Sequence, residues 1–250
     1  MPAIKVFLLV ALLFFTGCDR VGDLTDNIAR SRIFDIGATE YELDMTRSDI
    51  NALERSLAMN IYPMDTQLNN LLRRLSVRDS YPPGEWKEAL LSEFYWLNEV
   101  VVMDKDQNIL SRHPETSIKK LTYKPAFPGA LDLGQGRVML AIEDTPLGSE
   151  VLMASSVFEG FELTGLILVN FDPRTFISLS NSPQEIILVT AHEVVWTGNF
   201  DHLLPVLNEI EWENLVSKKI RGKLKLQDEE FFWFARAVGE DWLIYLVQDD

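Results

Sequence analysis

The first strong pattern along the chain is helical. Apolar residues recur at helical intervals between Leu43 and Leu75, mostly three, four or seven positions apart, which is the spacing of one face of an α-helix. Residues 39–42, Thr-Glu-Tyr-Glu, have the spacing of a capping box at its start. Pro63 lies inside the pattern and has no backbone N–H for a helical hydrogen bond. We therefore predict a long helix over residues 39–80, either one kinked helix or two joined helices.

After the Pro-Pro-Gly break at residues 82–84, a second helix is predicted, and the period then changes from helical to extended. A strand, a turn and a strand are expected next, followed by a Pro- and Gly-rich crossing and three further strands. A short helix is predicted to begin at Pro173. The corresponding residues are 85–99 for the helix, 100–112 for the strand pair, 113–135 for the crossing, and 136–144, 150–158 and 163–172 for the strands.

The second half of the chain repeats this order of elements. Residues 185–198 again predict strand, turn and strand, and residues 202–219 predict a helical crossing. Three strands follow, at residues 222–230, 231–238 and 241–250. The repetition predicts an α+β protein with two antiparallel sheet units, at residues 81–181 and 182–250. One large mixed sheet is the alternative.

The apolar run at residues 6–15 is about half the length of the roughly 20 residues that cross a bilayer. Lys5 precedes it and small residues follow it, which is typical of a secretory signal peptide. Residues 14–18, Phe-Phe-Thr-Gly-Cys, resemble the lipobox of bacterial lipoproteins, with Phe15 where that family usually has leucine. A plain core helix and ordinary secretion without lipid are the alternatives.

The lipobox resemblance implies that residues 1–17 are removed and that Cys18 carries fatty acyl chains, such as palmitate, which hold the chain on the cell membrane. Residues 18–38 would then be a tether. In enteric-type lipoproteins an aspartate directly after the cysteine resembles the signal for retention in the inner membrane, and Asp19 has that position. The resemblance therefore favours the periplasmic side of the inner membrane.

The mature chain would carry 22 Lys and Arg against 38 Asp and Glu, a net charge of −16. Such a charge repels phosphate backbones, which argues against nucleic-acid binding. It also predicts a body that stands off anionic lipid headgroups. Cys18 is the only cysteine, so disulfides, thiolate catalysis and cysteine–zinc sites are excluded once it is acylated.

The order of elements resembles the Cache family of PAS-like extracellular sensor domains, in its double form with two units on one long helix. The resemblance covers residues 40–250 and is carried by residues 101–104 (Val-Val-Met-Asp), 108–110 (Asn-Ile-Leu), 136–137 (Gly-Arg), 239–242 (Gly-Glu-Asp-Trp) and the strand that ends at Asp172. It implies two five-stranded antiparallel sheets. It also implies a small ligand in the first, membrane-distal unit, between the sheet and the crossing.

No pattern in the sequence predicts an enzyme, a cofactor or a metal site. His192 and Glu193 begin like a zinc-protease motif, but Trp196 stands where the second histidine is required. Amino-acid-binding members of the Cache family carry an Arg/Trp/Tyr clamp, and only its tyrosine has a counterpart in residues 123–127. The candidate ligand-binding residues are polar or aromatic side chains expected near the crossing: Arg112, His113, Tyr123, Lys124, Phe127 and Ser155.

Three functions are compatible with these features. The first is a lipid-anchored, extracytoplasmic small-molecule-binding or sensing subunit, which would act through a membrane signalling partner because the sequence has no second membrane helix or output domain. The second is a non-enzymatic structural or assembly lipoprotein of the cell envelope. An envelope hydrolase is the third and has the least support.

Overall fold

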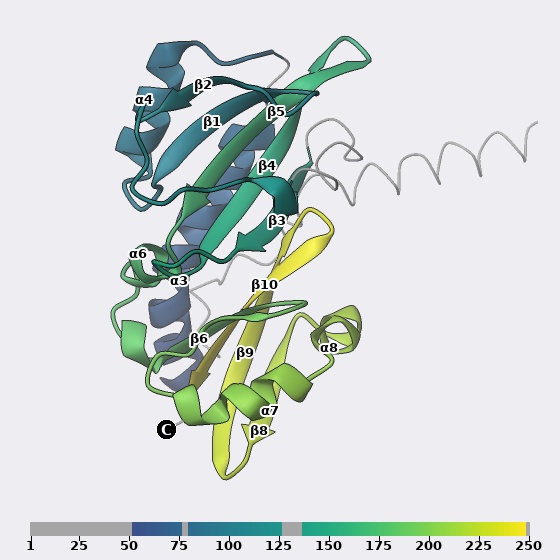
Figure 1. Cartoon of the computed structure of the whole chain (residues 1–250). Coiled ribbons are helices and arrows are strands. Elements are labelled where there is room, and N and C mark those ends of the chain that lie inside the picture. The colour runs from purple at the N-terminus through teal and green to yellow at the C-terminus, as the bar shows by residue number, and fades with distance from the viewer. Residues whose placement is uncertain (1–51, 77–79, 127–136, 249–250) are drawn as a thin grey trace, which may run out of the picture. The chain divides into compact units, whose positions relative to one another are not determined.

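The computed structural model describes residues 52–76, 80–126 and 137–248. Two five-stranded antiparallel sheets form its framework (Figure 1). The first sheet has the strand order β2-β1-β5-β4-β3, and the second has the order β7-β6-β10-β9-β8. The two orders are the same when five is added to each strand number, so the repetition predicted from the sequence is confirmed as a repeated topology. The alternative of one mixed sheet is wrong.

The first unit begins with two helices and continues into its sheet. Its elements are α3 (Ala52–Ser76), α4 (Gly84–Glu93), β1 (Glu99–Asp104), β2 (Ile109–His113), the 3-10 helix η2 (Lys124–Ala126), β3 (Val138–Glu143), β4 (Glu150–Glu159), β5 (Glu162–Phe171) and α6 (Pro173–Ile177).

The second unit repeats the pattern with a helical crossing. Its elements are η3 (Pro183–Glu185), β6 (Ile186–Thr190), β7 (Val194–Trp196), η4 (Asp201–Leu203), α7 (Leu204–Glu209), α8 (Trp212–Lys218), β8 (Arg221–Leu226), β9 (Glu229–Val238) and β10 (Asp241–Gln248).

Helix α3 continues through Pro63 as one helix over the described part of the predicted long helix. Because proline has no N–H, the carbonyl of Met59, four residues earlier, loses its helical donor. The side-chain amide of Asn181 donates to that carbonyl at 3.4 Å. Asn181, from the segment that connects α6 to η3, therefore supplies the hydrogen bond that the helix lacks at Met59.

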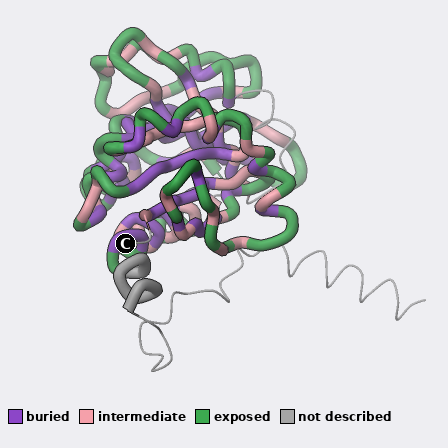
Figure 2. The backbone as a smooth tube through the Cα atoms, turned by 90° about the horizontal axis from the view of Figure 1, so that it is seen from below, coloured by how far each residue is buried: buried purple, intermediate pink, exposed green. Residues whose placement is uncertain are grey.

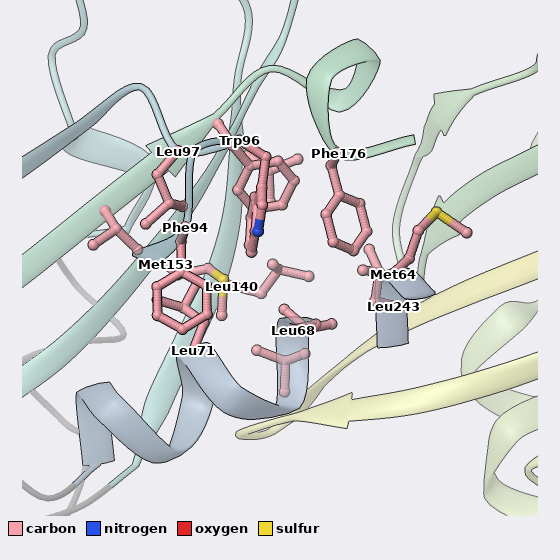
Figure 3. Close-up of a cluster of buried hydrophobic side chains, with 14 of the residues drawn as sticks. Met64, Leu68, Leu71, Phe94, Trp96, Leu97, Leu140, Met153, Phe176 and Leu243 are labelled. Atoms are coloured by element: carbon pink, nitrogen blue, oxygen red, sulfur yellow. The ribbon is translucent and has the colours of Figure 1, made fainter. Parts of the chain in front are cut away.

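The largest hydrophobic cluster joins α3 to both sheets. The helix buries residues at alternating intervals of three and four, which form one stripe: Ile61, Met64, Leu68, Leu71 and Leu75. Figure 3 draws part of this stripe among side chains of the first sheet, such as Met153, and of the second, such as Leu243. Continuous buried stretches occur instead in strands such as β4 and β5, and Figure 2 colours buried residues purple along the backbone. One core therefore spans both sheets.

Two further clusters cover the opposite face of each sheet. In the first sheet a small cluster lies under the crossing and includes Val101, Leu168 and Tyr123. In the second sheet a larger one lies under α7 and α8 and includes Trp212 and Trp233. Alternate residues of each strand thus face α3 or a crossing segment, which is the period-two consequence of the extended backbone.

A buried ion pair fastens α3 to the second sheet. Nε of Arg236, on β9, donates to a carboxylate oxygen of Asp65 at 2.6 Å, and Nη2 contacts the second oxygen. Burial disfavours the charged guanidinium, but Asp65 outweighs it and raises the pKa of Arg236. Two charges of opposite sign therefore enter the core as a pair.

Several expected boundaries differ from the structure. The second predicted helix, residues 85–99, ends at Glu93, because β1 already begins at Glu99. The predicted crossing helix at residues 202–219 is divided into η4, α7 and α8. The predictions for residues 1–38, and for the part of the long helix before residue 52, lie outside the described residues. No helix within the described ranges is long and apolar enough to cross a membrane.

Candidate functional site

The candidate site lies on the face of the first sheet that residues 114–126, here called the crossing segment, cover. Side chains alternate between the two faces of a strand, and on this face three polar side chains follow the buried apolar residues of β1, β4 and β5 at one end of the sheet. We call this the polar end of the sheet. The three side chains are Glu99 on β1, Asn170 on β5 and Glu150 on β4, and all three are buried. Glu99 and Asn170 are direct partners in the pairing of β1 with β5. The sheet therefore presents two neighbouring polar side chains toward the crossing segment.

Tyr123 connects the crossing segment to this polar end. Its hydroxyl donates to Oε1 of Glu99 at 2.7 Å and accepts from Nη2 of Arg112 at 3.0 Å. Tyr123 is 3% exposed and has a left-handed φ of 59°. Burial, followed by the hydrogen bond to Glu99, raises the pKa of Tyr123 well above its ordinary value, so the phenol stays a donor.

Glu143 on β3 holds the backbone of the crossing segment at this point. Its two carboxylate oxygens accept from the N–H groups of Thr122 and Tyr123 at 2.6 and 2.8 Å. These bonds fix the start of η2, which lies against β3 and β4. Ala126 of η2 is buried in the small cluster on this face of the sheet. The unusual backbone conformation of Tyr123 is therefore stabilised by a carboxylate from the sheet.

Lys119 of the crossing segment pairs with two neighbouring carboxylates, those of Glu150 and Asp172. Its ammonium lies 2.7 Å from Oε1 of Glu150 and 2.8 Å from Oδ2 of Asp172. The side-chain amides of Asn98 and Asn170 also donate to Glu150. Glu150 is fully buried, and Lys119 gives it a countercharge from within the chain.

Asp172 combines a structural and an electrostatic role. It caps α6, where Oδ1 accepts from the N–H of Arg174 at 2.9 Å. Burial opposes its ionisation, but hydrogen bonds from Arg174 and Lys119 outweigh burial and hold the pKa of Asp172 well below its usual range. Asp172 is therefore ionised at neutral pH and helps to position Lys119.

Two buried acceptor atoms at the polar end have no hydrogen-bond partner within the described residues: Oε2 of Glu99 and Oδ1 of Asn170. Burial is the main reason that the pKa of Glu99 is raised, although Tyr123 and Arg112 act against it. Buried polar atoms are nearly always paired in folded proteins. The arrangement can therefore accept hydrogen bonds from one donor group that lies between the two strands.

The structure places the candidate ligand-binding residues predicted from the sequence in different parts of the first unit. Arg112 and Tyr123 are in contact in the candidate site. Lys124 is exposed at the start of η2, and Phe127 lies outside the described residues. His113 is paired with Val100 on β1, and Ser155 donates to the carbonyl of Leu75 in α3. His113 and Ser155 therefore belong to the opposite face of the sheet from Arg112.

Sequence reasoning did not single out Glu99, Lys119, Glu150, Asn170 or Asp172 as site residues. A signal was present, because three of them are polar residues at the ends of otherwise apolar strands, as in Glu-Val-Val-Val, Glu-Val-Leu-Met and Leu-Val-Asn-Phe. A charged residue that continues an apolar strand is expected to be paired when it is buried. Among the described residues, there is no group of three or more His, Cys, Asp or Glu side chains that could hold a metal ion.

The structure is similar to sensor domains that have been solved. These include the ligand-binding domain of the Pseudomonas aeruginosa PAO1 amino acid chemoreceptor PctB, in complex with L-Gln (TM-score 0.52, 17% identity, 79% of this chain and 90% of that one). The domain of the P. aeruginosa chemoreceptor PctC, in complex with GABA, matches with a TM-score of 0.50 and 13% identity over 79% of this chain and 100% of that one.

An extracellular ligand binding receptor from Desulfohalobium retbaense matches 76% of this chain with a TM-score of 0.50 and 13% identity, and this chain spans 38% of that receptor. No protein-family model and no curated protein matches the sequence. At these identities the likeness is one of fold. The chain has the Cache-like fold of chemoreceptor ligand-binding domains, as the order of its elements led us to expect.

Proposed function

We propose that this protein is a lipid-anchored, extracytoplasmic subunit that binds a small molecule and acts through a membrane signalling partner. Two lines support the proposal. Its fold is the one found in ligand-binding domains whose solved complexes hold L-Gln and GABA. Its first sheet also carries a buried polar site beneath the crossing segment, in the unit that holds the ligand by resemblance to the Cache family.

The acceptor atoms of Glu99 and Asn170, which have no hydrogen-bond partner among the described residues, are the observation that carries the proposal. They lie on residues that face each other across β1 and β5, so one donor group can reach both. Leaving such atoms unpaired costs about 1–3 kcal/mol each, which a bound donor would recover. The ligand class that fits is a small molecule with an amine, amide or hydroxyl donor.

A thermal-shift screen tests ligand binding. The full chain, extracted from membranes, is heated with amino acids, amines, polyols and organic anions. A ligand present at 100 times its dissociation constant stabilises a protein by about 2.7 kcal/mol, which raises the midpoint by several degrees. Glu99→Gln should abolish the shift, because its amide replaces an acceptor with a donor. Glu162→Gln, on the exposed β4–β5 hairpin, should keep it. Absence of a shift with every compound would count against a ligand.

The lipid anchor has its own test. Cys18→Ser should remain unprocessed, migrate more slowly in electrophoresis than the mature wild type and carry no labelled palmitate. Unchanged migration and membrane association would contradict the anchor and leave the ligand site unaffected. Affinity capture of the wild type in mild detergent should then recover a membrane protein with a signalling domain.

One observation favours the second candidate function, a structural or assembly lipoprotein without a ligand. Lys119 already gives Glu150 and Asp172 a countercharge, so this part of the site is satisfied by the chain itself. If Lys119→Met loses stability without gaining affinity for any amine, the site is structural. If it gains amine binding, the ammonium of Lys119 holds a position that a ligand can take.

A further inference from the structure

A strongly basic surface interrupts this acidic protein in its second unit. Between Glu213 and Asp228 the chain contains no acidic residue and five cations within eight positions. We call this set the basic strip: Lys218, Lys219, Arg221, Lys223 and Lys225. The whole chain has a net charge of −15, so a local run of one positive sign is a distinct feature.

All five cations of the basic strip are exposed. Lys218 ends α8, and Lys219 connects it to β8. Arg221, Lys223 and Lys225 alternate along β8, so their side chains leave one face of the strand, while Leu226 is buried in the core. β8 is an edge strand, bonded to β9 on one side. The cations therefore line an edge of the second sheet that no further strand of the described residues extends.

Nearby acids limit the strip at one end. Lys225 faces Glu230 across β8 and β9, and Asp228 lies in the turn between these strands. On β8, Arg221 is opposite Phe234, and Lys223 is opposite Phe232. Glu230 and Asp228 therefore lie at the Lys225 end of the strip.

The composition of the strip favours a charged surface over a specific protein partner. Four of its five cations are lysines, which are depleted in protein–protein interfaces, where arginine and aromatic residues are enriched. None of the exposed large hydrophobic side chains of the described chain lies between residues 205 and 248. A surface with many point charges and no apolar anchor is suited to diffuse attraction by anionic lipid headgroups.

The position of the strip in the fold agrees with this partner. Lys223 shares a row across the sheet with Phe232 and Val247, so the β8 part of the strip lies toward the end where β10 finishes. Lys218 and Lys219 precede Ile220, whose carbonyl accepts from Ala235 nearer the middle of β9. Figure 1 draws the first turn of α3 at the same end of the second sheet. A tether that precedes α3 would bring this end of the molecule toward the bilayer.

We propose that the basic strip binds the anionic headgroups of the membrane and orients the second unit against the bilayer. The acidic remainder of the body is repelled by the same lipids, so attraction at one edge and repulsion elsewhere select one orientation. The surface is thus a peripheral membrane contact, additional to the proposed lipid anchor and ligand site.

Lysine footprinting on vesicles tests the orientation. The full chain is reconstituted on vesicles of phosphatidylcholine alone or with one third phosphatidylglycerol, treated briefly with an amine-acetylating reagent and digested for mass spectrometry. Modification of Lys218 and Lys219 is divided by that of Lys105 and Lys120, exposed lysines of the first unit, so reconstitution yield cancels. We expect this ratio to fall about fivefold with the anionic lipid, because headgroups shield the strip.

Salt and charge reversal complete the test. The Debye length shrinks from about 10 Å at 0.1 M to about 3 Å at 1 M salt, so high salt should restore the ratio. In the variant Lys218→Glu/Lys219→Glu, Lys225 should lose its protection against acetylation. Lys105→Glu/Lys120→Glu should leave Lys225 protected. A thermal melt of each variant identifies any that fail to fold, and the wild-type ratio stands without them.

Two results would overturn the proposal. The first is an equal footprint on neutral and anionic vesicles. The second is protection that appears in native membranes and never with phosphatidylglycerol, which would assign the strip to an acidic protein. Failure of the chain to associate with neutral vesicles would instead count against the lipid anchor, so the two proposals fail separately.

Discussion

Three buried carboxylates of the first sheet show how neighbours change the behaviour of one chemical group. Glu150 has a lysine and two amides around it, Asp172 has a lysine and an arginine, and Glu99 has Tyr123 on one oxygen and no partner among the described residues on the other. Burial raises the pKa of Glu99, whereas hydrogen bonds hold that of Asp172 low. The two acids should therefore affect stability with opposite dependence on pH.

For Asp172, the folded-state pKa lies below the ordinary value of 3.8, so its contribution to stability is complete above pH 3.8 and is lost as the pH falls through the folded value. Asp172→Asn keeps a good N-cap residue but removes the charge. The variant should be less stable than the wild type at pH 7, and this difference should vanish at low pH. Urea denaturation across the pH range measures it.

Glu99 gives the opposite slope. Its folded-state pKa lies above 4.5, so the wild type should lose stability as the pH rises from 4.5 through the folded value. Glu99→Gln should flatten that decline and gain relative to the wild type toward neutral pH. Parallel urea midpoints for Glu99→Gln and the wild type over this range would show that Glu99 is not the group responsible.

At the scale of elements, α3 makes one core out of two sheets. Its buried stripe contacts residues of both sheets, and the cluster that it completes is the largest in the described chain. The second sheet has a separate core under α7 and α8, which α3 does not enter. A change in α3 should therefore weaken both sheets, whereas a change in α7 should act first on the second sheet.

Leu68→Ala and Leu207→Ala form a matched pair, because both leucines are fully buried and lie in helices. Each substitution should cost about 2–5 kcal/mol through lost burial and a cavity. By hydrogen exchange, Leu68→Ala should accelerate β5 and β10 alike, whereas Leu207→Ala should accelerate β10 more than β5. Equal acceleration of the two strands by both variants would mean that the sheets open as one unit.

At the scale of the whole described molecule, the two units meet at the β9–β10 turn. A Cβ on Gly239 would lie 1.9 Å from the carbonyl oxygen of Val138, at the start of β3. Beside this contact, Arg137 reaches Glu240 at 3.3 Å, an exposed pair of little energetic weight. Close backbone approach at a glycine, more than charge, therefore defines the junction.

Gly239→Ala tests this junction against a control with the same backbone. Gly239 and Gly160 have φ values of 64° and 65°, but nothing lies within 4 Å of a Cβ at Gly160. Gly160→Ala should cost only the conformational term of about 1–2 kcal/mol. Gly239→Ala should cost clearly more and should accelerate hydrogen exchange in β3, because the turn must move away from Val138. Equal losses of stability would show that the contact at Val138 is unimportant.

Local pattern predicted most of the architecture. The change of hydrophobic period near residue 99 separated the helices from the sheets, and the recurring order of elements predicted two units with five strands each. These predictions succeeded because period and turn residues depend on near neighbours in the chain. Boundaries were less accurate, as at Glu93, where a helical pattern extends into a turn that precedes a buried strand.

The candidate site depended on contacts that no local pattern contains. Lys119 meets Glu150 and Asp172, which lie 31 and 53 positions further along the chain, and Tyr123 meets Glu99 on the far side of a strand pair. Ser155 was expected near the ligand, but strand register turned it toward α3. A single step of register exchanges the two faces of a strand, and local composition constrains register weakly.

The sequence by itself determined the repeated α+β order, the acidic surface with one basic interruption, and the chemistry that a chain with one cysteine can and cannot perform. Tertiary structure alone decided which polar side chains are buried together and which acceptors are left without a partner in the described chain. The reason is physical: burial and pairing depend on long-range packing, whereas period, composition and net charge are properties of neighbouring residues or of simple sums.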